Sequence, residues 1–192
     1  FCVSSPMNEY NQTLGKRQDE VTMSSEATGN MRHYEILLHV RNSSTVFSKV
    51  IGVDLFTLLG ALNTDVFESV NVIEKSDDGR TAKVVVVYKH FGKEMGVPRK
   101  YSSFKLTRSD AQGQIKVKTA ALVCPQHLVP QGHVEHISDD SAMFCVTPDP
   151  DDRGGRISYS FSVQQAGVPA AARDLAGLLM KKVFTRLKTF LE

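Results

Sequence analysis

The sequence predicts an α+β fold in which a curved antiparallel β-sheet wraps around one long C-terminal α-helix. Two observations predict it. The apolar runs between residues 33 and 164 are short and separated by turn residues, which favours strands joined by tight links in an antiparallel sheet. The last run leads through a Gly-Val-Pro corner into a long amphipathic segment that ends the chain. A terminal helix of this kind must pack back on the sheet that precedes it.

The N-terminal third predicts a polar tail, two strands and a short helix. Residues 1–31 are rich in Ser, Asn, Thr, Glu and Gln without a sustained period, and we expect a flexible tail there. Residues 33–41 and 45–53 are strand candidates because apolar side chains recur within them. Asp54 then offers an N-cap to a short helix that ends near Asn63.

The middle of the chain predicts strands in hairpin pairs. Residues 66–75 and 81–90 flank Ser-Asp-Asp-Gly at 76–79, and Asp-Gly between two apolar runs is a hairpin signal. Residues 101–107 and 114–122 form a second pair around a short polar loop. We therefore expect these strands to lie side by side and antiparallel.

A loop, a strand region and a final strand precede the terminal helix. Residues 124–132 contain two prolines and are expected to form a loop, and residues 134–146 are a strand region. The final strand alternates four apolar side chains with Ser158, Ser160 and Ser162, the period of a half-buried strand. Pro169 suits the first turn of the helix, where a missing N–H costs nothing. The apolar side of that helix carries Leu175, Leu178, Leu179, Val183, Leu187, Phe190 and Leu191.

The composition favours one globular domain with a tail and disfavours several protein classes. The 41% hydrophobic content of the 192 residues is ordinary for such a domain. The 23 basic and 21 acidic residues are interspersed, so the net charge of +2 does not indicate nucleic-acid binding. Three cysteines without C-x-x-C spacing predict a reducing compartment, and no run approaches the roughly 20 apolar residues of a membrane span. Because the chain begins with Phe, we expect a piece of a longer protein.

Three stretches of the sequence resemble the START (StAR-related lipid-transfer) domain of the helix-grip superfamily. They are VIGVDLFTLLGALN, CPQHLVPQGHVEHISDDSAMFCVTP and RISYSFSVQQAGVPAAARDLAGLLMKKVFTRLKTFLE. The last stretch is similar to a START terminus, in which the final strand turns at a Gly-x-Pro-like corner into a lid helix. The resemblance implies a START-like domain with the helix-grip fold over residues 32–192, preceded by a polar tail over residues 1–31.

The resemblance also implies a function. It points to a binding module and not an enzyme, without a cofactor, that takes a single hydrophobic ligand, a sterol or an acyl lipid, into a cavity between the sheet and the C-terminal helix. Such a module serves lipid transfer or sensing at membranes. In that family the loop equivalent to residues 125–132 and the terminal helix gate the cavity. We expect a cytoplasmic monomer that is peripheral at membranes.

The inward faces of the expected strands and helix indicate which residues line this cavity. A curved sheet and one helix leave space between them when the inward side chains are modest in size. Tyr159 and Thr119 would supply polar handles for an amphipathic ligand, and Leu128 and Val129 would stand at the mouth. The expected ligand-binding residues are Arg99, Phe104, Leu106, Val117, Thr119, Leu128, Val129, Tyr159, Phe161, Leu179 and Val183.

Two other functions stay open at this point. A protein-interaction or scaffold module would keep the fold but fill the cavity with side chains, as packed interiors usually do. A cyclase-like enzyme would use polar groups in the cavity, such as Tyr159 with Arg99, to protonate a reactive chain. The sequence contains no nucleophile elbow, no phosphate-binding glycine loop and no His-Glu-x-x-His motif.

A histidine cluster and a basic helix side raise two further possibilities. His133 and His136 are three residues apart, so on one strand they would face opposite sides, and we predict no metal site. The polar side of the terminal helix would meet an anionic membrane surface transiently, each basic residue contributing about 1 kcal/mol, or would simply be solvated. The basic residues concerned are Lys181, Lys182, Arg186 and Lys188.

Overall fold

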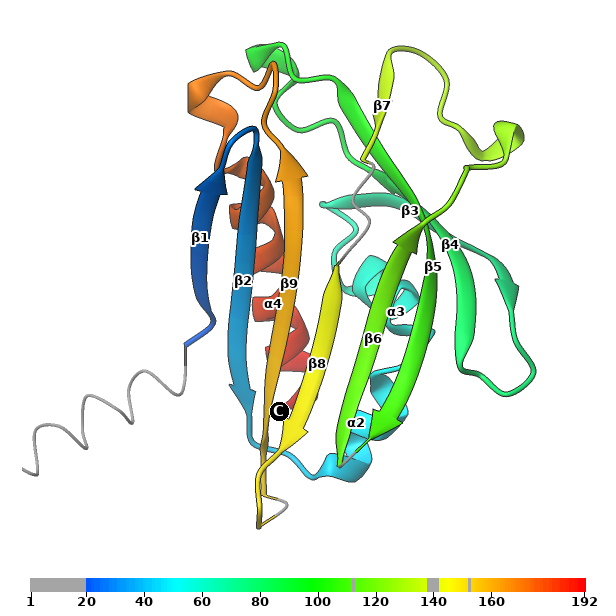
Figure 1. The fold of residues 1–192 in the computed structure, drawn as a ribbon, viewed down its shortest axis with the longest axis vertical. Coiled ribbons are helices and arrows are strands. Elements are labelled where there is room, and N and C mark those ends of the chain that lie inside the picture. The colour runs from blue at the N-terminus through cyan, green and yellow to red at the C-terminus, as the bar shows by residue number, and fades with distance from the viewer. Residues whose placement is uncertain (1–19, 112, 138–141, 152) are drawn as a thin grey trace, which may run out of the picture.

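The computed structural model describes residues 20–192 except 112, 138–141 and 152 (Figure 1). Its strands are β1 (Thr22–Thr28), β2 (Met31–Val40), β3 (Phe67–Lys75), β4 (Thr81–Tyr88), β5 (Arg99–Ala111), β6 (Gln114–Ala121), β7 (Val134–His136), β8 (Met143–Pro148) and β9 (Gly155–Gln164). Its helices are α2 (Ser44–Val50), α3 (Leu55–Leu62) and α4 (Leu175–Leu191), with short 3-10 turns η1 (Lys93–Met95), η2 (Gln126–Leu128) and η3 (Ala170–Ala172).

The strands form one open, curved sheet in the order β1-β2-β9-β8-β6-β5-β4-β3 (Figure 1). Every neighbouring pair in this order is antiparallel. The short strand β7 is the exception, because it pairs parallel with the start of β5 and brings Glu135 opposite Lys100. The expected α+β fold, with an antiparallel sheet wrapped around a long C-terminal helix, is therefore confirmed.

One face of the sheet is apolar because side chains alternate along each strand. In β2, Tyr34, Ile36 and Leu38 are buried, while the residues between them are more exposed. In β9, Ile157 and Phe161 are buried. Helix α4 packs against β1 and β2 at one end of the sheet, and α3 packs against β3 at the other. The hydrophobic core lies between these helices and the sheet.

Helix α4 packs more tightly along its C-terminal half than along its N-terminal half. In the C-terminal half, Val183, Phe184 and Leu187 are at most 1% exposed. In the N-terminal half, Leu175 and Leu179 are only half-buried. The apolar stripe of α4 therefore joins the core fully only beyond the middle of the helix.

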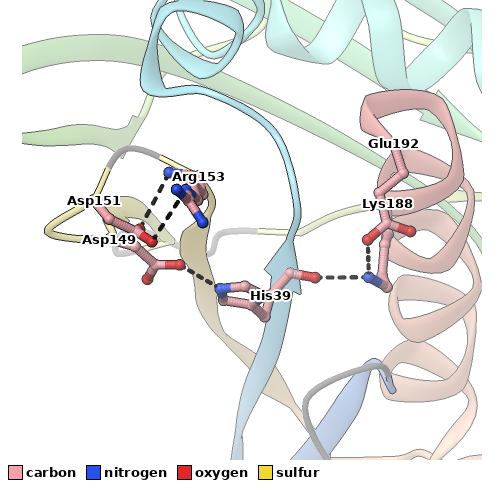
Figure 2. A network of polar contacts seen from close by, with 6 residues as sticks. All are labelled: His39, Asp149, Asp151, Arg153, Lys188 and Glu192. Atoms are coloured by element: carbon pink, nitrogen blue, oxygen red, sulfur yellow. Dashed lines mark hydrogen bonds and ion pairs between the residues drawn. The ribbon is translucent and has the colours of Figure 1, made fainter. Parts of the chain in front are cut away.

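The C-terminal end of α4 is tied to the sheet by a network of polar contacts (Figure 2). Lys188 is only 8% exposed. Its amine donates to the carbonyl oxygen of His39 in β2 at 2.7 Å and also pairs with Glu192. The His39 imidazole in turn meets the carboxylate of Asp149 in the β8–β9 turn, with 2.7 Å between Nε2 and Oδ2. The end of α4, the end of β2 and the β8–β9 turn are thereby fixed together.

The N-terminal end of α4 is held by a second set of contacts. The Tyr34 hydroxyl donates to the carbonyl oxygen of Arg173 at 2.7 Å. Arg32 pairs with Asp174, the N-cap residue of α4, with 2.7 Å between Nη2 and Oδ1. Burial raises the pKa of the Tyr34 hydroxyl, so it stays a neutral donor. We call the Tyr34–Arg173 and Arg32–Asp174 contacts the α4 clasp.

The structure corrects the prediction of a strand over residues 45–53, because helix α2 occupies residues 44–50. Phe47 and Ile51 are both fully buried and are four residues apart. Residues four apart share one face in a helix and also in a strand. A short apolar stretch with this spacing therefore does not distinguish a helix from a strand. The predicted short helix after Asp54 is confirmed as α3.

The structure also places a strand inside the segment 1–31 that was expected to be a tail. Strand β1 pairs with β2 along its whole length, from Thr22 opposite Leu37 to Thr28 opposite Met31. Its side chains are mostly exposed because it is an edge strand, so they show no apolar alternation. The expected tail over residues 1–19 lies outside the described residues.

The remaining strands lie where the sequence predicts them, except that one predicted strand region contains two strands. The hairpin pairs β3–β4 and β5–β6 are confirmed. The strand region 134–146 divides into β7 and β8, and residues 138–141 between them lie outside the described residues. Over the described part of the chain, no helix has the length and apolar character needed to cross a membrane.

Candidate functional site

A pocket of about 630 Å³ lies between the sheet and the N-terminal half of α4. Its walls come from β5, β6 and β9 on one side and from α4 on the other, with α3 contributing Phe56. One end is formed by the β4–β5 connection, β7 and the β9–α4 connection, which gather at the upper end of the molecule in Figure 1. We call this end the mouth.

Aromatic rings from three elements line the interior of the pocket. The rings of Phe56 in α3 and Phe104 in β5 lie with their centroids 4.8 Å apart. Tyr159 and Phe161 stack along β9 with 5.2 Å between centroids. Tyr159 also packs on Phe184 of α4 at 4.8 Å, which connects the pocket wall to the buried half of the helix. The interior thus offers a rigid apolar surface.

Two hydroxyl groups of the pocket wall already have partners. Thr119 Oγ1 donates to the carbonyl oxygen of Ala142 at 3.1 Å. Ser102 Oγ donates to the hydroxyl oxygen of Tyr88 at 3.1 Å. Because their hydrogen bonds are made within the wall, these two side chains do not require a ligand for satisfaction.

Charged side chains of the pocket wall gather at the mouth. The four charged residues among the described lining are Lys89, Lys100, Arg173 and Glu135. Lys100 and Glu135 pair across the β5–β7 ladder. Their side chains keep 28% and 52% exposure, respectively, so water and a ligand can reach both.

Gln165 contributes an unsatisfied acceptor at the mouth. Its backbone N–H donates to the carbonyl oxygen of Asn30 at 2.7 Å, which fixes the residue at the start of the β9–α4 connection. Its side-chain oxygen Oε1 is buried and has no hydrogen-bond partner within the described structure. Gln165 lines the pocket, whereas this oxygen is enclosed by protein atoms.

His136 fastens β7 to the sheet beside the mouth. Its Nε2 accepts a hydrogen bond from the backbone N–H of Ser103, with 3.3 Å between the nitrogens. Its ring packs on Tyr101 with 5.0 Å between centroids. The contact with Ser103 requires Nε2 to be unprotonated, so the neutral ring with its proton on Nδ1 fits this geometry.

Solved structures with similar architecture are found at low sequence identity. The human StarD13 (DLC2) lipid transfer and protein localization domain matches with a TM-score of 0.64 and 10% identity, over 100% of this chain and 99% of that one. Human StAR-related lipid transfer protein 5 matches with a TM-score of 0.66 and 10% identity, over 95% and 92%. This chain has the START-like helix-grip fold. Human STARD10 matches it as well, with a TM-score of 0.60 and 7% identity, over 96% and 80%.

Sequence comparison adds no family assignment to this fold. No protein-family model matches the sequence, and no curated protein matches it either. The START-like helix-grip architecture is therefore established through structure.

Five residues expected from the sequence line the pocket of this START-like domain. They are Phe104, Thr119, Tyr159, Phe161 and Leu179. Three others, Leu106, Val117 and Val183, are at most 1% exposed and belong to the packed core. On their strands and helix they lie on the same face as the lining residues. They are further from the mouth, in the region where α4 packs directly on the sheet. Contact with a ligand stays a prediction for all of them.

Arg99 lies on the face of β5 opposite to the pocket. Lys100, Ser102 and Phe104 line the pocket, and alternation places Arg99 on the other side. There it pairs with Glu68. The sequence prediction named Arg99, whereas the register of β5 brings the neighbouring Lys100 to the pocket.

Leu128 and Val129 also lie outside the pocket lining. They belong to η2 and the residue after it and are half-buried. The lining from this connection comes instead from Glu135, His136 and Ile137. The parallel pairing with β5 holds the short strand β7 at the mouth, and a gating role of residues 125–132 stays a prediction.

Sequence analysis missed most residues of the mouth. Most of them come from connections, where no period of two or 3.6 indicates which side chains point inward. The Gly-Val-Pro corner was visible only as a turn, and the segment with η1 was not assigned. The missed residues include Phe91, Val97, Pro98, Lys100, Gln165, Val168 and Arg173.

The basic side of α4 is less free than the sequence suggested. Lys188 is buried and bound to His39 and Glu192, so it cannot meet a membrane. Lys182 and Arg186 both pair with Asp65 in the turn after α3. Hydrogen bonds from Arg186 and then Lys182 hold the pKa of the Asp65 carboxyl well below its usual range. Lys181 is exposed.

Within the described residues, the histidine cluster and the cysteines are not arranged as a metal site. No group of three His, Cys, Asp or Glu side chains there is arranged to hold a metal ion. Cys124 and Cys145 are both half-buried free thiols. Burial raises the pKa of the Cys124 thiol, which lowers its reactivity at neutral pH.

Proposed function

We propose that this domain binds one lipid molecule in the pocket between the sheet and α4 and transfers or presents it at membranes. The START-like helix-grip fold supports the proposal, because two structures that share it are named as lipid-transfer proteins or domains. The domain would work on the cytoplasmic face of membranes as a peripheral protein.

The pocket itself carries the proposal. Its volume of about 630 Å³ lies within the range of about 300–1,000 Å³ found for small-molecule sites. Its interior is lined by Phe56, Phe104, Tyr159 and Phe161. Burial of a methylene group contributes about 0.8 kcal/mol, so ten buried methylenes would contribute roughly 8 kcal/mol before the costs of association.

The two halves of α4 suggest how the ligand enters. The C-terminal half is buried and anchored through Lys188, whereas the N-terminal half covers the pocket and is held by the α4 clasp. Breaking the two clasp contacts would let the β9–α4 connection and the first turns of α4 move outward while the far end stays fixed. Lid motions of this kind commonly gate binding sites.

The two alternatives have less support from the geometry. A filled scaffold module would not leave a pocket lined by half-buried apolar side chains such as Leu179. A cyclase based on Tyr159 with Arg99 would need both groups in the pocket, and Arg99 pairs with Glu68 on the other face of the sheet. Lipid binding is therefore the function that the site supports best.

The test is native mass spectrometry of the purified protein, followed by organic extraction and identification of the released lipids. Leu179→Trp fills the pocket, and we expect it to lower lipid occupancy at least tenfold because a tightly sized cavity does not accept extra volume. Leu178→Trp is the matched control, since Leu178 is 56% exposed on the same helix. A wild-type protein that carries no lipid and takes up none from vesicles would refute the proposal.

A further inference from the structure

We infer that the face of the sheet opposite to the pocket binds an extended acidic segment of a partner protein, with Glu or Asp at alternate positions. The inference goes beyond the proposed function, because the pocket, α3 and α4 all lie on the other face (Figure 1). Three lysines on two neighbouring strands carry it. We call Lys105 of β5 and Lys116 and Lys118 of β6 the lysine row.

The lysine row lies on the outer face because side chains alternate along both strands. The two residues that flank Lys105 are at most 6% exposed and belong to the core, so Lys105 faces outward. In β6, Val117 is 1% exposed, so the lysines on either side of it face outward as well. The three lysine side chains therefore share one face of the sheet.

The register of β5 and β6 sets the three side chains in one line. Lys116 and Lys118 are two residues apart, which corresponds to about 7 Å along a strand. Lys105 lies opposite Ala120, the next outward residue after Lys118. An extended peptide repeats the side chains of one side with the same step of about 7 Å. Carboxylates at alternate positions of such a peptide therefore match the lysine row.

The lysine row has no carboxylate partner within the fold, unlike other surface cations such as Lys75, which pairs with Asp54. Over the part of the chain that the structure describes, no lysine of the row takes part in an ion pair. No Asp or Glu stands at an outward position of β5, β6 or β8. Asp110 of β5 lies on the inner side, where it pairs with Arg108.

Lys83 adds a like charge directly beside the row. It lies opposite Lys105 across the β4–β5 ladder, and like charges directly opposite are destabilising. The carboxylate on its other side, Glu74, is 2.6 Å from Lys83 Nζ and is already paired. The fold thus keeps cations together at a cost in stability, which is typical of a functional surface. A bound acidic segment would offset their repulsion.

The surroundings of the row favour an acidic peptide over two other polyanions. Proteins stack single-stranded nucleic acid on aromatic rings, and helices that bind membrane surfaces add large apolar side chains to their basic ones. The outward neighbours of the row include no aromatic and no large exposed apolar residue. Two of them, Thr107 and Ser109, have hydroxyl groups that can donate to carboxylates. These neighbours are Thr107, Ser109, Ala120, Met143 and Cys145.

The test is an NMR titration of the ¹⁵N-labelled full chain with a peptide that repeats Glu-Ser four times between terminal glycines. We expect saturable shifts of the β5 and β6 amides, and binding at least tenfold weaker for the matching Gln-Ser peptide. Raising NaCl from about 50 to about 500 mM should weaken binding at least fivefold, because salt screens exposed charges.

A matched pair of triple variants assigns the binding to the lysine row. Glutamine at all three positions of the row should weaken binding of the Glu-Ser peptide about tenfold or more, since each exposed ion pair contributes a factor of about two to five. The control combines Lys89→Gln, Lys93→Gln and Lys181→Gln, which remove the same charge from exposed positions elsewhere. The row variant should melt no lower than the wild type, because the repulsion by Lys83 is relieved.

The outcomes that would overturn the inference are distinct. Equal peptide binding by the row variant and the control, or shifts outside β5 and β6, would show that the lysine row is not the site. Vesicles of equal parts phosphatidylcholine and phosphatidylserine, or an oligouridylate, serve as competing partners. If either binds through the row more tightly than the peptide, the acidic-peptide assignment is wrong. Lipid binding in the pocket stands or fails separately, by the extraction experiment.

Discussion

Lys188 shows how one residue can change role between sequence and structure. On the helix it occupies a position that the sequence assigns to a polar face, yet it is 8% exposed. Its amine donates to the carbonyl oxygen of His39 at 2.7 Å and pairs with Glu192 (Figure 2). A buried ammonium group is tolerated because these acceptors surround it. The residue fastens the helix and does not present a charge to solvent.

The substitution Lys188→Met should therefore lower the free energy of unfolding. Methionine keeps most of the apolar stem, but the His39 carbonyl oxygen loses its charged donor, and we expect a loss of about 1–3 kcal/mol. Urea denaturation measures it. The control is Lys181→Met on the exposed side of the same helix, where a change within about 0.5 kcal/mol is expected. Equal effects of the two substitutions would contradict the anchoring role.

At the scale of elements, the contact between α4 and β2 depends on the absence of a side chain at Gly177. A Cβ built there would lie 2.4 Å from Cε1 and 2.7 Å from Cδ1 of the Tyr34 ring. That ring is 2% exposed, and its hydroxyl is bound to the Arg173 carbonyl oxygen, so it cannot easily move aside. The close approach lets the first half of α4 lie directly on the strand.

This geometry reverses the usual effect of replacing glycine in a helix. Alanine is favoured over glycine by about 1 kcal/mol from helix propensity alone. We nevertheless expect Gly177→Ala to destabilise the domain by about 1–3 kcal/mol because of the overlap with Tyr34. Thermal unfolding checks the sign. In a Tyr34→Ala background, where the ring is absent, the same substitution should become neutral or stabilising. A stabilising effect in the wild-type background would rule out the clash.

At the scale of the whole molecule, Asp65 links the two helical parts that cover the sheet. It lies in the turn between α3 and β3 and binds two residues of α4. Lys182 Nζ is 2.6 Å from its Oδ2, and Arg186 Nη2 is 3.1 Å from the same oxygen. Arg186 also donates to Oδ1 of Asn63, the C-cap residue of α3, at 3.2 Å. The Asp65 carboxylate therefore connects the end of α3 to α4, the two helices that cover the sheet.

The link should make stability depend on acid pH. The pKa of the Asp65 carboxyl is held below its unfolded value of about 3.9, so its contribution is fully present above that pH and is lost as the pH falls further. We expect the wild-type unfolding free energy to fall more steeply between pH 5 and 2 than that of Asp65→Asn. Asp77→Asn, in the β3–β4 turn, is the control and should follow the wild type. Parallel curves for the wild type and Asp65→Asn would refute the link.

The architecture was predictable from the sequence where the chain repeats a period. Strand β9 alternates apolar and hydroxyl side chains, and α4 repeats apolar residues at offsets of three and four. Segments without such a period were misassigned. Strand β1 exposes most of its side chains, and in α2 the spacing of Phe47 and Ile51 suits both a helix and a strand.

The sequence by itself determined the α+β class, the final strand and helix, and the apolar wall residues Phe104, Tyr159 and Phe161. These follow from local periods, which each segment carries within itself. Only the tertiary structure decided that Lys100 and not Arg99 faces the pocket, and that the side-chain oxygen of Gln165 is buried without a partner in the described structure. Both depend on strand register and on which connections meet at one end of the sheet, and contacts between distant segments leave no period in the sequence.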